Sequence, residues 1–291
     1  MKSENDKPLF NNEVIMKNNV FHTIDVVPES EADAKGYVKI ARIIYKDKEE
    51  EPKYRKNRHV VCIVHHNEPL FQGCTEFILK GDDKLQPLMC DQYGSYPNRV
   101  CLAGTSLCGK SYLAGKMAED YSSRFPDNKI CIFSYIDQDD AYDSLKNLHR
   151  IRIDESILDE PIDLKELHDA LIIFDDIECF TNKYIRDELV RLRNACINSG
   201  RHEGIATISI RQQMLEGSQT KATLNGMFQF VGFPHAASRF QFGNWLDRYL
   251  GLNRKQIKEI LKLPSRFVLV NNTAPLFVLY EKGCKLIEHD I

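Results

Sequence analysis

The chain has 291 residues, of which 43% are hydrophobic, enough for one large core or for a core domain with a smaller partner unit. Charged residues make up 28% and the formal net charge is −3, which excludes a protein that binds nucleic acid over its whole surface. No apolar run approaches the length that spans a bilayer, and the N-terminus does not resemble a signal peptide, so we expect neither a membrane partner nor secretion. The nine cysteines form no CxxC pair, which favours free thiols in a reducing compartment.

The N-terminal third divides into two parts. Residues 1–18 are polar and rich in Asn and Lys, which predicts a flexible tail. Residues 19–94 contain β-like runs at 37–45, 59–66 and 75–81, and these predict a small β-rich N-terminal unit. No pattern in this unit indicates its role.

Residues 95–291 show a different pattern, in which apolar runs alternate with segments of helical periodicity such as 110–125 and 182–200. Central strands that read as continuous apolar runs are buried on both faces, so the alternation predicts an α/β fold with a parallel sheet between helices. The chain closes with a predicted β-hairpin at 266–283. The runs expected to form the sheet are 99–104, 129–136, 170–177, 205–210 and 228–233.

Two further helices are expected before the hairpin. One covers 253–264 and ends at Pro264. The other, 239–249, is aromatic and basic and contains the only tryptophan. Its helical spacing favours packing in a core or a subunit interface over base stacking. The residues on that face are Phe242, Trp245, Leu246 and Tyr249.

A phosphate-binding loop follows the first core strand, since residues 104–111 fit the pattern G-x-x-x-x-G-K-[ST]. The glycines permit backbone angles that let amide groups surround a phosphate, Lys110 reaches the β- and γ-phosphates, and the Ser111 hydroxyl coordinates Mg²⁺. The loop lies between a predicted strand and a predicted helix, whose positive end faces the anion. The residues expected to bind ATP are Gly104, Thr105, Ser106, Leu107, Cys108, Gly109, Lys110 and Ser111.

The acidic half of the site is predicted at the end of the run 170–177. Asp175 is expected to hold Mg²⁺ through water, and Asp176 to polarise the attacking water; Glu178 is a rival for the second role. One strand intervenes between the phosphate-loop strand and this acidic strand, which favours the RecA-like class of motor ATPases over simple kinases and GTPases.

The stretch 198–214 resembles the fourth core strand of the FtsK–HerA superfamily of DNA-pumping ATPases. Its pattern is an arginine, two residues, Gly-Ile, an apolar strand and a glutamine, matched by Arg201, Gly204-Ile205 and Gln212. The residues Gly-Arg-His of this stretch and the acidic motif Phe-Asp-Asp are most similar to the poxvirus-type genome-packaging ATPases of large DNA viruses. The resemblance implies that Arg201 supplies charge to the site of the next subunit and that Gln212, or alternatively Gln213, senses the γ-phosphate.

The resemblance also implies a function. We expect an ATP-hydrolysing, Mg²⁺-dependent motor that forms a homo-oligomeric ring, translocates double-stranded DNA and packages a viral genome, with capsid proteins as further partners. Its expected location is the host cytoplasm, the viral factory or the virion. The alternatives are a P-loop ATPase that remodels protein or RNA, and a structural virion subunit ordered by nucleotide. Candidate DNA contacts, which could equally be solvated surface residues, are Lys183, Arg186, Arg191, Arg193 and Lys221, with the loop ending near Asn225-Gly226.

Overall fold

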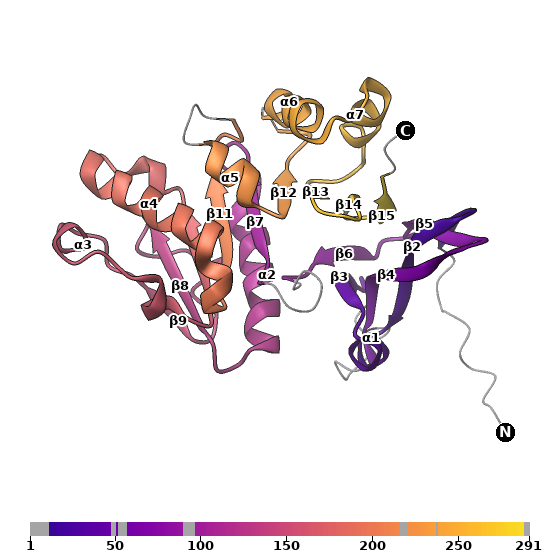
Figure 1. Cartoon of the computed structure of the whole chain (residues 1–291), viewed down its shortest axis with the longest axis horizontal. Coiled ribbons are helices and arrows are strands. Elements are labelled where there is room, and N and C mark those ends of the chain that lie inside the picture. Colours follow the sequence, from indigo (N-terminus) through magenta and orange to yellow (C-terminus); the bar gives the residue numbers. More distant parts are fainter. Residues whose placement is uncertain are drawn as a thin grey trace.

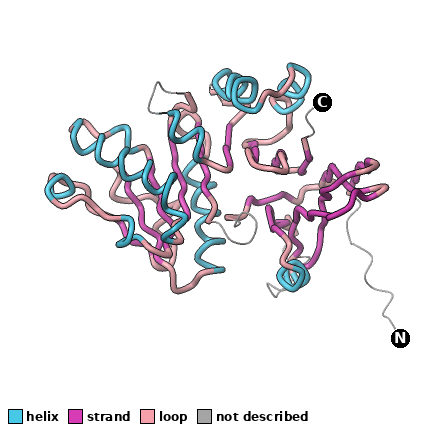
Figure 2. Tube along the Cα trace, viewed as in Figure 1, coloured by secondary structure: helices cyan, strands magenta, loops and turns pink. Residues whose placement is uncertain are grey.

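The structure is a computed structural model that describes residues 12–47, 51, 57–89, 97–215, 220–236 and 238–287. In these ranges the strands form one eleven-stranded sheet and one four-stranded sheet. Figure 1 shows the parallel half of the large sheet with its helices on the left and the four-stranded sheet on the right. Figure 2 shows that strands predominate at the lower right, beside one short helix, while two helices lie above them at the upper right. The predicted α/β class is confirmed.

The parallel half of the large sheet contains all five predicted core strands. Its order is β9-β8-β10-β11-β7-β12, and its neighbouring strands pair in parallel. Strand β11 lies between β7 and β10, so one strand separates the phosphate-loop strand from the acidic strand, as the RecA-like class requires. The bounds are β7 Arg99–Ala103, β8 Lys129–Ser134, β9 Leu148–Arg150, β10 Ala170–Asp175, β11 Ala206–Arg211 and β12 Gln229–Gly232.

The helices of the core follow from capping and spacing. In α4, Asn182 caps the N-terminus by accepting a hydrogen bond from the Tyr184 amide at 3.0 Å, and the apolar face packs on the sheet. Long and short helices alike follow the strands. Their bounds are α2 Lys110–Arg124, α3 Ser156–Asp159, η2 Leu164–Leu167, η3 Ile177–Cys179, α4 Lys183–Ser199, η4 Gly200–Glu203, α5 Thr220–Gly226, α6 Arg239–Leu250 and α7 Arg254–Ile260.

The aromatic face predicted in α6 is buried except at its C-terminal end. Phe242, Trp245 and Leu246 are buried, and the rings of Phe242 and Trp245 lie parallel with centroids 6.1 Å apart. Tyr249 is 44% exposed, so it does not pack in the core of this chain, and its alternative place in a subunit interface stays a prediction. The buried stripe continues through Leu250 instead, because that residue lies closer to the line of the inner face.

The other half of the large sheet is antiparallel and joins both ends of the chain. The predicted hairpin is present as β13 and β14, and a further strand, β15, follows it. Strand β15 pairs with β5 of the N-terminal unit, and β5 pairs with β1. The bounds are β13 Val268–Asn271, β14 Phe277–Tyr280, β15 Gly283–Leu286, β5 Gly73–Ile78 and β1 Glu13–Lys17.

One sequence prediction changes here, and one stays untested. Residues 13–17, expected within a flexible tail over 1–18, form β1, because backbone pairing with β5 orders a segment whose side chains are exposed; residues 1–11 lie outside the described part. The boundary between 19–94 and 95–291 does not separate the sheets, because β5 lies in the large sheet. That division stays a prediction.

The N-terminal unit contributes the four-stranded sheet, in the order β2-β4-β3-β6. A short helix, α1, follows β2 and covers one end of this sheet, as Figure 1 shows. The bounds are β2 Val20–Pro28, α1 Glu29–Lys35, β3 Val38–Ile44, β4 His59–Leu70 and β6 Lys84–Pro87.

A buried ionic network fixes helix α2 to the N-terminal unit. Asp120 on α2 lies 3.2 Å from the Arg42 guanidinium of β3 and 3.1 Å from that of Arg124. It also accepts a hydrogen bond from the Met89 amide at 3.1 Å, and Arg42 pairs with buried Glu29. The helix that begins at the phosphate-binding loop is therefore anchored at its far end to the N-terminal unit.

We expect Asp120→Asn to lower the free energy of unfolding by about 3 kcal/mol, because it leaves two arginines around a buried site without their shared counter-charge. Urea unfolding measures the effect. The control is Glu119→Gln on the same helix, where an exposed ion pair with Lys116 is lost and the change should stay below about 0.5 kcal/mol. Equal stabilities of the two variants would contradict the anchoring role of Asp120.

Candidate nucleotide-binding site

The loop between β7 and α2 has the backbone that a phosphate cradle needs. Gly109 has a φ of +104°, a backbone conformation that residues other than glycine rarely adopt. A Cβ at Gly104 would lie 2.8 Å from Cys108 Sγ and 2.9 Å from the Phe233 ring, closer than real contacts. Leu107, with a φ of +64°, projects fully into solvent at the tip of the loop. Both glycines of the predicted motif are therefore required by geometry.

Lys110 and Ser111 are the first two residues of α2, directly after this loop. Lys110 is only 6% exposed, and its ammonium donates to the carbonyl oxygens of Gly104 at 2.8 Å and Thr105 at 3.1 Å. The Ser111 hydroxyl lies 3.5 Å from Asp175 Oδ2. A hydroxyl beside a carboxylate fits Mg²⁺, which takes few protein ligands and fills the remaining positions with phosphate oxygens and water. In the described ranges no group of three or more His, Cys, Asp or Glu side chains could hold a metal.

Asp175 ends β10 in a buried position beside the loop. Burial, together with the nearby charge of Asp176, raises the pKa of Asp175 to about 6, while a hydrogen bond from the Tyr142 hydroxyl at 3.1 Å opposes that rise. Burial, and then the charge of Asp175, raise the pKa of Tyr142 in turn. Sequence reasoning missed Tyr142, which lies in an acidic connection with no strand or helix periodicity.

Asp176 and Gln212 meet at the carboxyl edge of the sheet. Asp176 has a φ of +48°, and its amide donates to the Ile210 carbonyl of β11 at 3.3 Å. Burial raises the pKa of Asp176, whereas the charge of Lys110 and a hydrogen bond from the Gln212 side chain lower it. Gln213 turns away and accepts a hydrogen bond from Gln241 at 3.4 Å. The structure therefore brings Gln212, and not its neighbour, to the acidic residues.

Glu178, the rival to Asp176, is occupied elsewhere. Its Oε1 lies 2.5 Å from Arg193 Nη1 and 3.2 Å from Arg211 Nε. Arg193 has no exposed surface, so its candidacy as a DNA contact is wrong: it lies on the face of α4 that packs on the sheet. Arg191 is exposed and pairs with Glu188. At the start of α4, Lys183 is exposed, while Arg186 is half-buried and donates to the Phe180 carbonyl at 3.4 Å.

Arg201 lies at the opposite edge of the sheet from the phosphate-binding loop. It is exposed in η4, before β11 begins, whereas β11 ends at Arg211, whose carbonyl accepts a hydrogen bond from the Gly104 amide at 3.1 Å. Six strand residues span roughly 20 Å, so Arg201 does not reach the site of its own chain. The side chain of Lys221, the remaining DNA candidate, lies outside the described part.

Comparison with known proteins adds a viral relative. The protein "Uncharacterized protein V3" of Sputnik virophage is 30% identical over 228 residues, which cover 75% of this chain and 91% of the relative. The chain belongs to the family of virophage protein V3. No protein-family model matches the sequence.

Solved structures similar to this virophage-family chain are more distant. The genome packaging NTPase B204 of Sulfolobus turreted icosahedral virus 2 is 13% identical, with a TM-score of 0.43 over 66% of this chain and 98% of that one. The pCW3 conjugation coupling protein TcpA is 10% identical, with a TM-score of 0.44 over 92% of this chain and 87% of that one.

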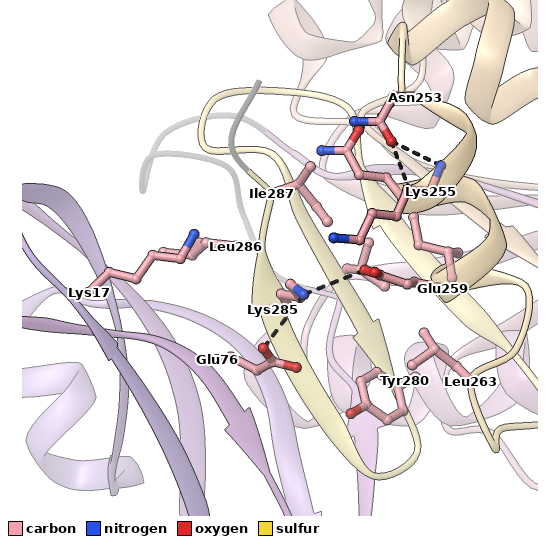
Figure 3. Close-up of a pocket in the computed structure, with 13 residues that line it drawn as sticks. Lys17, Glu76, Asn253, Lys255, Glu259, Leu263, Tyr280, Lys285, Leu286 and Ile287 are labelled. Carbon is pink, nitrogen blue, oxygen red and sulfur yellow. Dashed lines mark hydrogen bonds and ion pairs between the residues drawn. The ribbon is translucent and has the colours of Figure 1, made fainter. Parts of the chain in front are cut away.

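A pocket of about 460 Å³ lies far from the phosphate-binding loop, between α7 and strands β1, β5, β14 and β15. Figure 3 shows Lys285 between two carboxylates, and the distances are 3.6 Å to Glu76 and 3.9 Å to Glu259. Lys285 therefore links the N-terminal strand β5, the C-terminal strand β15 and α7. In this member of the family the pocket therefore lies where the N-terminal strands β1 and β5 adjoin the C-terminal strand β15 and α7.

No helix in the described part is long and apolar enough to cross a membrane.

Proposed function

We propose that this protein is an Mg²⁺-dependent ATPase that translocates double-stranded DNA and packages a viral genome into a capsid. The observation that carries the ATPase proposal is the meeting of Lys110, Ser111, Asp175 and Asp176 at one edge of the parallel sheet, beside a loop shaped for phosphate. The DNA proposal rests on the sequence resemblance around Arg201 and Gln212, and membership of a virophage protein family agrees with a viral role.

The residues divide the work of phosphoryl transfer among them. Lys110 neutralises charge on the β- and γ-phosphates, and Ser111 and Asp175 hold Mg²⁺, which when bound adds positive charge at the same oxygens. Asp176 orients the attacking water, for which it must be ionised, and both Lys110 and Gln212 favour its ionised form. Gln212 is placed to report the presence of the γ-phosphate to the segment that follows it.

The remaining charge comes from a second subunit. Because Arg201 lies exposed at the far edge of its own sheet, the proposed role requires a homo-oligomeric ring in which it enters the neighbouring site. Capsid proteins are the proposed further partners. For DNA, the proposed contacts at the start of α4 are the exposed Lys183 and the half-buried Arg186, and contacts to the phosphate backbone do not require a particular sequence.

The test is the rate of ATP hydrolysis against the concentration of duplex DNA, at low and at moderate salt. We expect DNA to raise the rate several-fold and added salt to weaken that effect, because phosphate contacts release counterions. A matched RNA duplex is the control. Stimulation by RNA alone would favour the remodelling alternative, and nucleotide binding without any hydrolysis would favour a structural subunit.

A further inference from the structure

Three charged side chains from three different elements meet beneath the nucleotide site. Glu178 comes from η3, Arg193 from the middle of α4 and Arg211 from the end of β11. Both arginines share one carboxylate oxygen, at 2.5 Å and 3.2 Å. The side chains of Arg193 and Arg211 are 0% and 1% exposed, and that of Glu178 is 20% exposed. We call this group the Glu178 cluster.

The cluster depends on the negative charge of Glu178. Two guanidinium groups lie beside one carboxylate oxygen, so this carboxylate is a partner of both. Nε and Nη2 of Arg193 have no hydrogen-bond partner within the described ranges, so Glu178 is the partner on which that side chain relies. Burial lowers the pKa of Arg193, and Glu178 opposes this more than Arg211 adds to it. Removing the carboxylate charge would leave the buried Arg193 guanidinium without this ion pair, beside a second arginine.

The cluster is joined by short backbone segments to the proposed catalytic residues. Glu178 follows Asp176 by two residues, in a loop closed by a 2.9 Å hydrogen bond from the Cys179 amide to the Asp176 carbonyl. Arg211 directly precedes Gln212. Asp176 is in a left-handed conformation, which costs a non-glycine residue free energy and persists only where its surroundings fix it. The Glu178 cluster supplies such surroundings: Glu178 follows Asp176 by two residues, and Arg211 adjoins Ile210, whose carbonyl accepts a hydrogen bond from the Asp176 amide.

We infer that Glu178 is a positioning residue: its ion pairs with Arg193 and Arg211 hold the loop of Asp176 and the end of β11 so that Asp176 and Gln212 face the reacting phosphate. This inference deepens the proposed ATPase function and rests on it. It replaces the hypothesis that Glu178 activates water, because Oε1 of Glu178 already faces Arg193 and Arg211. It also ties the active site to α4, the helix that ends at Ser199, two residues before Arg201.

The test compares Glu178→Gln, Arg193→Met and the double variant. We expect each single variant to lower kcat about 10- to 100-fold, because a small displacement of a catalytic group has effects of this size. Binding of a fluorescent, non-hydrolysable ATP analogue with Mg²⁺ should change less than about 3-fold, since the loop and Lys110 are untouched. The double variant should lose little more than either single one, because both changes break the same contact.

Two further variants separate positioning from folding. Arg193→Lys keeps a cation and should recover part of the lost rate, whereas Glu188→Gln, which breaks the ion pair with Arg191 on the same helix, should leave the rate unchanged. If Glu178→Gln is inactive while Arg193→Met is fully active, Glu178 is the base that activates water, and the inference is overturned. Normal turnover of Glu178→Gln would overturn it as well.

Hydrogen exchange tests the cluster without reference to hydrolysis. In Glu178→Gln, amides of 175–180 should exchange faster than in the parent protein, while those of 104–111 should not change. Unchanged exchange at 175–180 would contradict the positioning role, even in a protein that hydrolyses no ATP. Absence of hydrolysis by the parent protein would contradict the proposed function alone.

Discussion

Lys110→Ala is expected to remove measurable ATP turnover and to weaken nucleotide binding. The ammonium is buried inside the loop, where it donates to two backbone carbonyl oxygens. A charge in such a preorganised site stabilises the transition state far more than one in water, and losing one such group typically costs about 10²- to 10³-fold in kcat. The measurement is steady-state phosphate release, together with binding of a fluorescent ATP analogue.

The matched control is Lys116→Ala, two turns along the same helix. Lys116 lies at the surface and pairs with Glu119 at 2.8 Å, so its loss should leave turnover unchanged. Ser111→Ala should be milder than Lys110→Ala, because water can replace one hydroxyl ligand of Mg²⁺. Full turnover by a folded Lys110→Ala protein would refute the assignment of the loop as the ATP site.

The sequence allowed the core to be predicted because its signals are local. Strand β10 reads as an unbroken apolar run since both of its faces are covered, and the loop at 104–111 has glycine at the two positions that the phosphate-binding pattern specifies. By contrast, β15 pairs with a strand some 200 residues earlier, and no local pattern encodes such a pairing. The sheet that unites the two ends of the chain was therefore visible only in the structure.

The candidate site divides in the same way. Asp175 and Asp176 could be predicted because they stand where an apolar strand ends, and the carboxyl ends of parallel strands meet at one edge. Gln212 was singled out by the family resemblance and lies beside Asp176 at the same edge. Tyr142 could not, since it comes from an irregular connection. Arg193 is a different case: it lies four residues after Leu189 and three before Cys196, on the buried stripe of α4. Helical spacing alone could have shown that this arginine faces inward.

Arg201→Ala is expected to slow hydrolysis about 10³-fold while nucleotide binding stays intact, because an arginine supplied by a neighbouring subunit acts chiefly on the transition state. The exposed neighbour His202, changed to alanine, is the control and should have little effect. Specific activity of the parent protein should rise with its concentration as rings assemble.

Mixing the two inactive chains tests the shared site directly. Arg201→Ala keeps an intact loop and Lys110→Ala keeps an intact arginine, so an interface between them can combine one working half from each. Recovery of activity in the mixture is the result that only a shared site explains, because within one chain Arg201 and the loop lie at opposite edges of the sheet. A rate that is independent of protein concentration and unchanged by mixing would leave an ATPase whose site is complete in one chain. In that case the ring, and the translocation that depends on it, would have to be abandoned.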